Sequence, residues 1–406
     1  MESKLREAVE VLKRFLEYKG TDIETGVPES IEILLKLATS VFQSDGEMPK
    51  EKFNDITTKD IQDGQEVSIK PLLLYSAPAS REEREMLAKI QARIHSSKKG
   101  DLAKVIPLAT PYSVHIDPSS LCNFKCKFCF QAQEDKPEQG LMTLPLYRKI
   151  INDICQFPDK IKKIKIGLHG ESTLHPKLVT MIKYLKKRNK TDTIELFTNG
   201  SLLNPYLNEE IIKGGLDRIN ISVEGLSSEQ YKKMTGVRVD IDKFIANIKR
   251  LYSIRGKCKI YIKTMTQDKE RFYNMFGNIC DEIFVENAVP QWPEIGNPVL
   301  PKVGMYGQPI KQWKEVCPFI FMYLHYNWDG SVSPCTLDWQ RKLIIGNANK
   351  KSALEIWQGK KLRDLRIAHL EGKRREIPVC DKCLAPMVCV EDDLDNKAKE
   401  LLERII

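Results

Sequence analysis

The sequence has no hydrophobic run of about 18 residues, the length that a membrane-spanning helix needs. It also lacks a charged segment followed by an apolar one at its start, the pattern of a secretory leader. Hydrophobic residues make up 42% of the chain and charged residues 29%, which is typical of a soluble globular protein. From these absences we predict a cytoplasmic protein that makes no membrane contact.

The basic residues do not gather into a stripe, although the formal net charge is +9. Lys and Arg are scattered along the chain among many Asp and Glu, whereas a nucleic-acid surface usually needs a clustered basic patch. Metal clusters ligated by several thiolates, or an anionic substrate, would offset part of the positive charge. We therefore do not expect a nucleic-acid partner.

Eleven cysteines in a large chain without an export signal do not predict a disulfide framework, because the cytosol keeps thiols reduced. Their grouping is more informative than their number. Three lie within eight residues near position 125, and five lie from Cys317 to Cys389. Cys155, Cys258 and Cys280 stand alone, and each is most simply a small buried apolar residue.

The 406-residue length predicts one large catalytic domain with smaller additions at its ends. Residues 1–105 have helical apolar spacing at Glu2 to Tyr18, Ile31 to Phe42 and Ser80 to His95. We interpret them as a helical N-terminal domain of unknown role.

Residues 106–290 alternate short β-rich segments with amphipathic helices. The predicted strands are Ser113 to Ile116, Lys163 to Leu168, Thr193 to Phe197, Arg218 to Val223, Lys259 to Lys263 and Glu282 to Val285. The predicted helices are Leu144 to Cys155, Pro176 to Lys187, Pro205 to Lys213, Asp240 to Ile254 and Lys269 to Ile279. This alternation predicts parallel strands joined by right-handed crossovers, and so an α/β fold with a partial (β/α)6 TIM-like barrel.

Residues 291–406 form a C-terminal extension. The segment from Asn287 to Pro309 is rich in Pro and Gly and indicates a linker or a lid. Phe321 to Asn327 and Ser331 to Cys335 flank Trp328-Asp329-Gly330, a pattern that predicts a β-hairpin. A helix is predicted from Ser352 to about Leu370, ahead of the last cysteines.

The first cysteine group follows the first predicted strand, with Cys122, Cys126 and Cys129 at C-x3-C-x2-C spacing. Soft thiolates select zinc, copper or iron-sulfur, and three ligands leave one position open. A structural zinc site normally has four ligands, and the nearest fourth candidate, His115, is expected inside a strand. A chance triplet or a zinc loop remains the alternative.

This spacing, with the aromatic Phe128 before the third cysteine, resembles the signature of the radical S-adenosylmethionine superfamily. The resemblance implies a [4Fe-4S] cluster whose free iron is chelated by the amino and carboxylate groups of S-adenosylmethionine. It further implies that the cluster reductively cleaves this cofactor to a 5′-deoxyadenosyl radical.

Three further segments resemble parts of the same family, over roughly Tyr112 to Val285. Gly167-Leu168-His169-Gly170-Glu171-Ser172 resembles the glycine-glycine-glutamate-proline motif, in which Gly170 and Glu171 would receive the amino group. His169 and Ser172 depart from that motif. Thr198-Asn199-Gly200 and Ser222-Val223-Glu224-Gly225 resemble segments beside the cofactor, which implies that Ser222 and Glu224 contact ribose hydroxyls or the methionine carboxylate.

The second cysteine group has the order C-x12-G-x4-C followed by C-x2-C-x5-C, which resembles the SPASM and twitch extensions of radical enzymes. Five thiols cannot ligate two four-cysteine clusters. The resemblance implies one auxiliary [4Fe-4S] cluster on Cys317, Cys335, Cys380 and Cys383, while Cys389 is unassigned or replaces another ligand. A structural zinc on the same four cysteines is the alternative.

A cluster held by four protein thiolates has no open iron, so we expect it to transfer electrons rather than bind substrate. It could accept the electron left on a substrate radical and make a net oxidation possible. The resemblance favours a carbohydrate-like or aminocyclitol substrate and an external electron donor such as flavodoxin or ferredoxin.

Other functions remain open. The chain could modify a peptide, or act as an epimerase with a thiol hydrogen donor at Cys389, Cys280 or Cys258. A zinc scaffold or a nucleic-acid adaptor is the non-enzyme alternative. His169 and His325 are candidate bases by position, although a lone histidine is more often a structural residue.

Overall fold

The computed structural model describes residues 88–92, 102–293, 295, 299–310 and 312–406. The chain divides into two units, Met1–Ser80 and Arg81–Ile406, and the described residues belong to the second. The helices predicted at Glu2 to Tyr18 and Ile31 to Phe42 lie outside the described residues.

One ten-stranded sheet organises the described part of the chain, in the order β1-β7-β6-β5-β4-β3-β2-β8-β9-β10. Its six central strands are parallel and lie side by side in sequence order. They are β2 (Ser113–Ile116), β3 (Ile161–Ile166), β4 (Thr191–Thr198), β5 (Arg218–Val223), β6 (Lys259–Thr264) and β7 (Glu282–Val285). The predicted α/β partial barrel is confirmed.

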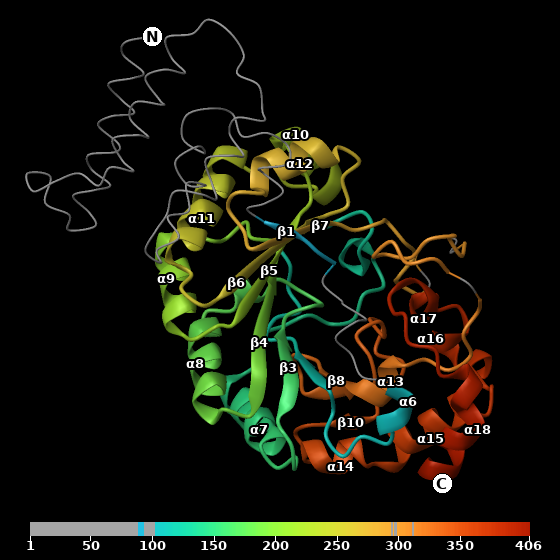
Figure 1. The fold of residues 1–406 in the computed structure, drawn as a ribbon. Helices are drawn as coiled ribbons and strands as arrows, with labels where there is room; N and C mark the ends of the chain where they lie inside the picture. Colours follow the sequence, from blue (N-terminus) through green and yellow to red (C-terminus); the bar gives the residue numbers. More distant parts are fainter. Residues whose placement is uncertain (1–87, 93–101, 294, 296–298, 311) are drawn as a thin grey trace, which may run out of the picture. The chain divides into compact units, whose positions relative to one another are not determined.

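Helices connect these strands along one side of the sheet (Figure 1). They are α7 (Leu144–Ile154), α8 (Leu178–Arg188), α9 (Pro205–Lys213), α10 (Ser228–Thr235), α11 (Ile241–Ile254) and α12 (Lys269–Phe276). All except α10 were predicted. Only Tyr231 and Thr235 are buried in α10, so its apolar periodicity is too weak to identify from the sequence.

The two faces of the sheet differ in chemistry, because successive side chains of a strand point to opposite sides. Isoleucines such as Ile166, Ile221 and Ile262 pack into one core with the helices. The alternate positions carry mostly polar side chains, namely Lys163, Lys165, Glu195, Arg218, Asn220, Ser222, Tyr261 and Lys263. A parallel sheet covered on both faces is usually apolar throughout, so the polar face marks the functional interior of the barrel.

The short strand β1 (Lys89–Ile90) pairs in parallel with β7. The predicted helix from Ser80 to His95 is therefore wrong at these residues, and its remainder lies outside the described residues. The edge of β7 offers unpaired backbone groups, which Lys89 and Gln91 satisfy by donating to the carbonyls of Asp281 and Ile283. This pairing overrides the local helical spacing.

The opposite edge of the sheet is extended by the C-terminal part of the chain. Strand β8 (Tyr323–Tyr326) pairs in parallel with β2, whereas β9 (Ser331–Ser333) and β10 (Gly346–Asn347) add in antiparallel fashion. The predicted hairpin is confirmed, and Gly330 has a φ of 86°, a left-handed conformation that favours glycine. The sequence did not predict that the hairpin would join the barrel sheet.

The predicted helix from Ser352 to Leu370 is two helices, α14 (Ala353–Trp357) and α15 (Lys360–Leu370), separated at Gly359 by extended backbone. The shorter helices are α6 (Leu102–Val105), α13 (Phe319–Met322), α16 (Pro378–Asp381), α17 (Ala385–Val388) and α18 (Ala398–Ile405). Single 3-10 turns occur at η4 (Phe130–Ala132), η5 (Ser172–Leu174), η6 (Arg374–Glu376) and η7 (Asp395–Lys397). None of the described helices has the length and apolar character needed to cross a membrane.

The proline-rich segment between the barrel and the hairpin is fastened to the C-terminal helices over its described residues. The Asn287 amide donates to the Met305 carbonyl, and the Met305 amide donates to the carbonyl of Val388. Met305 is 4% exposed and belongs to a second core, which the C-terminal helices also share.

The C-terminal extension also enters the barrel core, which predicts a large stability effect at Trp357. Its side chain is 1% exposed, and its indole nitrogen donates to the carbonyl of Leu108 at 2.8 Å. Trp357→Ala should lower the free energy of unfolding by about 3–5 kcal/mol, measured by chemical denaturation. Tyr206→Ala, at a position 76% exposed, should change it by less than about 0.5 kcal/mol. If both variants lost equally little free energy of unfolding, the conclusion that the C-terminal extension and the barrel share one core would be contradicted.

Candidate functional site

The loop after β2 carries Cys122, Cys126 and Cys129 at the carboxyl edge of the sheet, and all three side chains are partly buried. Burial raises the pKa of Cys122 to about 11 and of Cys129 to about 12, and raises that of Cys126 further. The neighbouring thiols and Glu224 raise the pKa of Cys126 as well. Thiols in this state are protonated at neutral pH, so binding a metal through them would release protons.

Helix α10 holds this loop in place. The amides of Lys125 and Lys127 donate to the carbonyls of Thr235 and Met234, at 2.9 and 3.0 Å. Phe124 is 2% exposed, and its ring meets that of Tyr231 edge to face. A sequence signal for this anchor exists only in Phe124, an apolar residue between two ligand positions.

Asn199 ties the end of β4 to the cysteine loop. The side-chain Nδ2 of Asn199 donates to Oδ1 of Asn123 at 2.9 Å, and Nδ2 of Asn123 in turn donates to the Ser201 hydroxyl at 2.8 Å. A further hydrogen bond from Asn199 favours the thiolate of Cys122. Asn199 therefore contacts the cysteine loop directly.

Glu171 is 1% exposed, and its carboxylate accepts four hydrogen bonds from within the protein. The amide and hydroxyl of Thr173 and the hydroxyl of Thr198 donate to Oε1, and the Asn199 amide donates to Oε2 at 2.7 Å. Burial raises the pKa of Glu171, and these hydrogen bonds lower it. The carboxylate thus fixes two strand ends, and Oε2 retains room for one more donor.

Gly170 faces the backbone of the cysteine loop. A β-carbon at this position would lie 2.4 Å from the carbonyl oxygen of Ser119 and 2.6 Å from that of Leu121. The Glu171 amide donates to the same Leu121 carbonyl at 2.8 Å. The structure therefore requires glycine here for the close approach of the two loops, a role distinct from the contact with the cofactor's amino group that the resemblance implied.

Glu224, Lys263 and Glu286 form a charged group near the cysteine loop. Lys263 pairs with Glu286 at 3.0 Å, and Glu224 acts electrostatically on all three thiols of the loop. Desolvation raises the pKa of the Glu224 carboxyl, which Lys263 lowers and Glu286 raises. Ser222 is half-buried and in register with Lys263, and Phe128 is partly exposed within the cysteine loop.

The second cysteine group converges on one small cavity. Its wall includes Cys317 before α13, Cys335 after β9, and Cys380 and Cys383 in and after α16. Burial, followed by the three other thiols, raises the pKa of Cys335 well above its usual value. Cys389 is buried in the second core and does not line this cavity.

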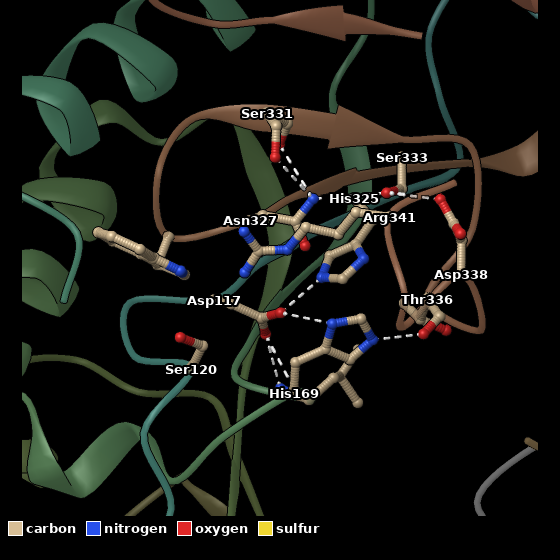
Figure 2. A network of polar contacts seen from close by, with 12 residues as sticks. Asp117, Ser120, His169, His325, Asn327, Ser331, Ser333, Thr336, Asp338 and Arg341 are labelled. Carbon is tan, nitrogen blue, oxygen red and sulfur yellow. Dashed lines mark hydrogen bonds and ion pairs between the residues drawn. The ribbon is translucent and has the colours of Figure 1, made fainter. Parts of the chain in front are cut away.

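A buried polar network joins the ends of β2 and β3 to β8 (Figure 2). Asp117 Oδ1 accepts from the Leu168 amide at 2.8 Å, and Asp117 Oδ2 accepts from Nε2 of His325 at 2.6 Å. His169 Nδ1 lies 3.5 Å from the same Oδ2, and His169 Nε2 donates to the carbonyl of Thr336, the residue after Cys335. The network thus links both cysteine-bearing segments.

The ligand atoms of Asp117, His169 and His325 lie within 4.8 Å of one another, a spacing that could hold a metal ion. The direct hydrogen bond between His325 and Asp117 already joins two of them. Each of the three side chains is at most 4% exposed, and His169 is turned toward the Thr336 carbonyl. We therefore interpret the group as a structural hydrogen-bond network, and not as the substrate base that the sequence left open.

An aromatic cluster of Phe130, Trp292 and Trp339 lies against this network. The Phe130 ring, next to Cys129, lies 5.0 Å from His169 and from Trp292, and it stacks on Trp339 at 5.5 Å. The Trp339 indole nitrogen donates to the carbonyl of Pro293 at 2.9 Å. Single aromatic residues carry no spacing signal, so the sequence did not identify this cluster.

Two of the three candidate thiol donors lie at the wrong end of the barrel. Cys258 precedes β6 and Cys280 precedes β7, so both are at the amino ends of strands and within the core. The cysteine loop lies at the carboxyl ends, where barrel active sites form. An epimerase mechanism that uses either thiol is therefore not supported.

Two family models match the chain. The radical SAM superfamily model matches residues 116–276, and the SPASM iron-sulfur cluster-binding domain matches residues 317–384. The first range holds Cys122, Cys126 and Cys129, and the second holds the four cavity cysteines. The chain belongs to the radical SAM superfamily and carries a C-terminal SPASM domain, so its cofactors are S-adenosylmethionine and [4Fe-4S] clusters.

Curated relatives match the chain over different lengths. The tungsten-containing aldehyde ferredoxin oxidoreductase cofactor-modifying protein of Pyrococcus furiosus is 25% identical over 68% of this chain and 88% of its own length. A probable GTP 3′,8-cyclase of Methanococcus maripaludis is 38% identical, but over 28% of this chain and 37% of its own length. The chain thus spans little more than a third of that cyclase.

Two solved structures resemble the chain to different degrees. Streptococcus suis SuiB bound to S-adenosylmethionine matches with a TM-score of 0.51 and 18% identity, over 90% of this chain and 86% of that chain. BtrN in complex with AdoMet and 2-DOIA matches with a TM-score of 0.49 and 15% identity, over 70% of this chain and 97% of that chain.

The buried His169 predicts a pH-dependent stability. Burial, followed by the His325 ring, lowers its pKa from 6.5 to about 4, so the unfolded chain binds more protons between these values. Stability is then complete above about pH 6.5 and falls as the pH drops toward 4. Anaerobic chemical denaturation should show a loss of about 1 kcal/mol from this group between about pH 7.5 and 6.0. His169→Gln should lose less over the same interval, and an unchanged pH slope would contradict the account.

Proposed function

We propose that this radical SAM enzyme oxidises a carbohydrate-like or aminocyclitol substrate, with the SPASM-domain cluster as electron acceptor. One observation carries the proposal: four cysteines from three separate segments of the chain converge on one buried cavity. Four thiolates close the coordination of a [4Fe-4S] cluster, which leaves it no position for substrate and suits it to electron transfer.

The residues of the first site fit a cluster with an open iron. Cys122, Cys126 and Cys129 are the three proposed ligands, and the structure provides no fourth cysteine in that loop. When bound, the cluster and S-adenosylmethionine supply the hydrogen-abstracting 5′-deoxyadenosyl radical of the superfamily. The protein's own contribution is to hold that loop rigid.

We assign the remaining predicted residues to two roles. Gly170, Glu171, Thr198 and Asn199 position the cysteine loop through the contacts described above, and Oε2 of Glu171 is available to an ammonium group. Ser222, Glu224 and Phe128 are proposed to contact the cofactor, because they lie on the same carboxyl edge of the sheet.

The barrel interior favours a substrate that is rich in hydrogen-bond donors. Oε2 of Glu195 and Oε1 of Glu286 are buried without a hydrogen-bond partner among the described residues. Their other oxygens form ion pairs with Lys163 and Lys263, both at 3.0 Å. Hydroxyl and amine groups of a sugar-like substrate would satisfy the free oxygens, and buried acceptors of this kind exclude apolar substrates.

A second candidate function is modification of a metalloenzyme cofactor. The Pyrococcus furiosus relative that bears such a description matches this chain over 88% of its own length. The two proposals share both clusters and differ in the substrate. Anaerobic assays that follow 5′-deoxyadenosine formation with aminocyclitols, peptides and cofactor precursors would separate them, since only a true substrate takes part in stoichiometric hydrogen abstraction.

Metal analysis tests the two-cluster proposal. The anaerobically reconstituted protein should contain about eight iron and eight sulfide per chain, falling to about four of each when Cys122, Cys126 and Cys129 are changed to Ala. Cys155→Ala is the matched control and should leave the count unchanged. Four iron with one zinc in the parent protein would remove the electron-accepting cluster, and zinc without iron would contradict the whole proposal.

A further inference from the structure

Arg374 lies on the wall of the four-cysteine cavity and is fully buried. Its Nη1 donates to the carbonyls of Cys380 and Cys383, at 2.9 and 3.0 Å. Its Nε and Nη2 are buried and have no hydrogen-bond partner among the described residues. The guanidinium therefore keeps a positive charge and unused N–H donors beside the four thiols.

His369, on α15, presents a second unused donor to the same cavity. The Cys317 amide donates to its Nδ1 at 3.2 Å, so Nδ1 is an acceptor and the ring proton is on Nε2. Nε2 is buried and has no partner among the described residues, and the side chain is fully buried.

Buried donors without acceptors are costly, so the cavity is built for an occupant that accepts hydrogen bonds. A [4Fe-4S] cluster with four thiolates is negatively charged and exposes sulfide and thiolate sulfurs. A guanidinium and an imidazole N–H complement both properties.

We propose that Arg374 and His369 donate hydrogen bonds to the sulfur atoms of the auxiliary cluster and raise its reduction potential. A positive charge and N–H donors stabilise the reduced cluster, which carries one more negative charge than the oxidised cluster. Arg374 and His369 are positioning residues, because they act on the reaction through the cluster. The inference rests on the proposed function and names the groups that tune its electron acceptor.

For the reaction, a higher reduction potential would increase the driving force for electron transfer from the substrate radical to the cluster. In the proposed oxidation, a carbon radical that bears a hydroxyl group would lose one electron to the bound cluster and one proton to solvent as the carbon-oxygen double bond forms. An external one-electron acceptor would then take up that electron. A higher potential at the cluster makes the first of these transfers more favourable.

A redox titration of the holoenzyme monitored by electron paramagnetic resonance tests this assignment. Arg374→Gln removes the charge. His369→Asn keeps an acceptor for the Cys317 amide, while its shorter side chain no longer places an N–H at the position of Nε2. Arg366→Gln is the matched control, because Arg366 is also a buried arginine but donates to the Ile320 carbonyl and does not line the cavity. The first-site cluster, identified by its response to S-adenosylmethionine, is the internal reference.

Arg374→Gln should lower the equilibrium constant for reduction of the auxiliary cluster at least tenfold, which is a fall of about 59 mV in its reduction potential for one electron. His369→Asn should produce a smaller fall in the same direction. Arg366→Gln should leave the auxiliary potential within a twofold change of the equilibrium constant, and the first-site potential should be constant in all variants.

An unchanged auxiliary potential in both cavity variants, with eight iron retained, would overturn this inference and leave the proposed function intact. Equal shifts in both clusters, or an equal shift in the Arg366 control, would also overturn it, because a general loss of structure would then explain the result. If Arg374→Gln fails to assemble the auxiliary cluster, His369→Asn decides. A parent protein with zinc in this cavity would show no auxiliary signal and would remove the proposed electron acceptor itself.

Discussion

The parallel pairing of β8 with β2 is the constraint on which both metal sites depend. The cysteine loop leaves the carboxyl end of β2, and the hairpin that leads to Cys335 begins with β8. Backbone hydrogen bonds between these strands fix the SPASM domain against the barrel along a shared register. Since strand pairing leaves little freedom of rotation, the segments that carry the first cysteine group and Cys335 are held on one sheet.

The Asp117 network strengthens this arrangement where the strands lead into the two cysteine-bearing segments. Asp117, His169 and His325 follow or belong to three neighbouring strands, and His169 reaches the carbonyl of the residue after Cys335. Helix α10 and Asn199 hold the cysteine loop from the other side. The site therefore has a dense supporting layer, which is what a loop must have to keep its three cysteine side chains in a fixed geometry.

The two faces of the sheet have different roles. The apolar face supplies stability through packing against the helices, and the polar face carries ion pairs and carboxylate oxygens that have no hydrogen-bond partner among the described residues. Burying polar and charged side chains on one face costs free energy of folding, and the large apolar core on the other face offsets this cost. Such polarity inside a parallel barrel is expected where a ligand completes the hydrogen bonding.

The six central strands and the grouping of the cysteines could be predicted because their signals are local. Arg218–Val223 has strand bounds identical to those predicted, and the cysteine spacings are visible within single loops. The hydrogen bond between Asp117 and His325 joins residues that are 208 positions apart in the sequence, so no local pattern predicts it. For the same reason the sequence missed the β2–β8 pairing, the aromatic cluster and the donors of Arg374 and His369.

The central claim is that the protein holds two [4Fe-4S] clusters, one with an open iron and one fully ligated by cysteines. Mössbauer spectroscopy of the 57Fe-labelled protein with and without S-adenosylmethionine tests it most directly. The account predicts that the cofactor changes the spectrum of one iron in eight and leaves the other seven as they were. A spectrum in which no iron responds, or in which irons of both clusters respond, would contradict it.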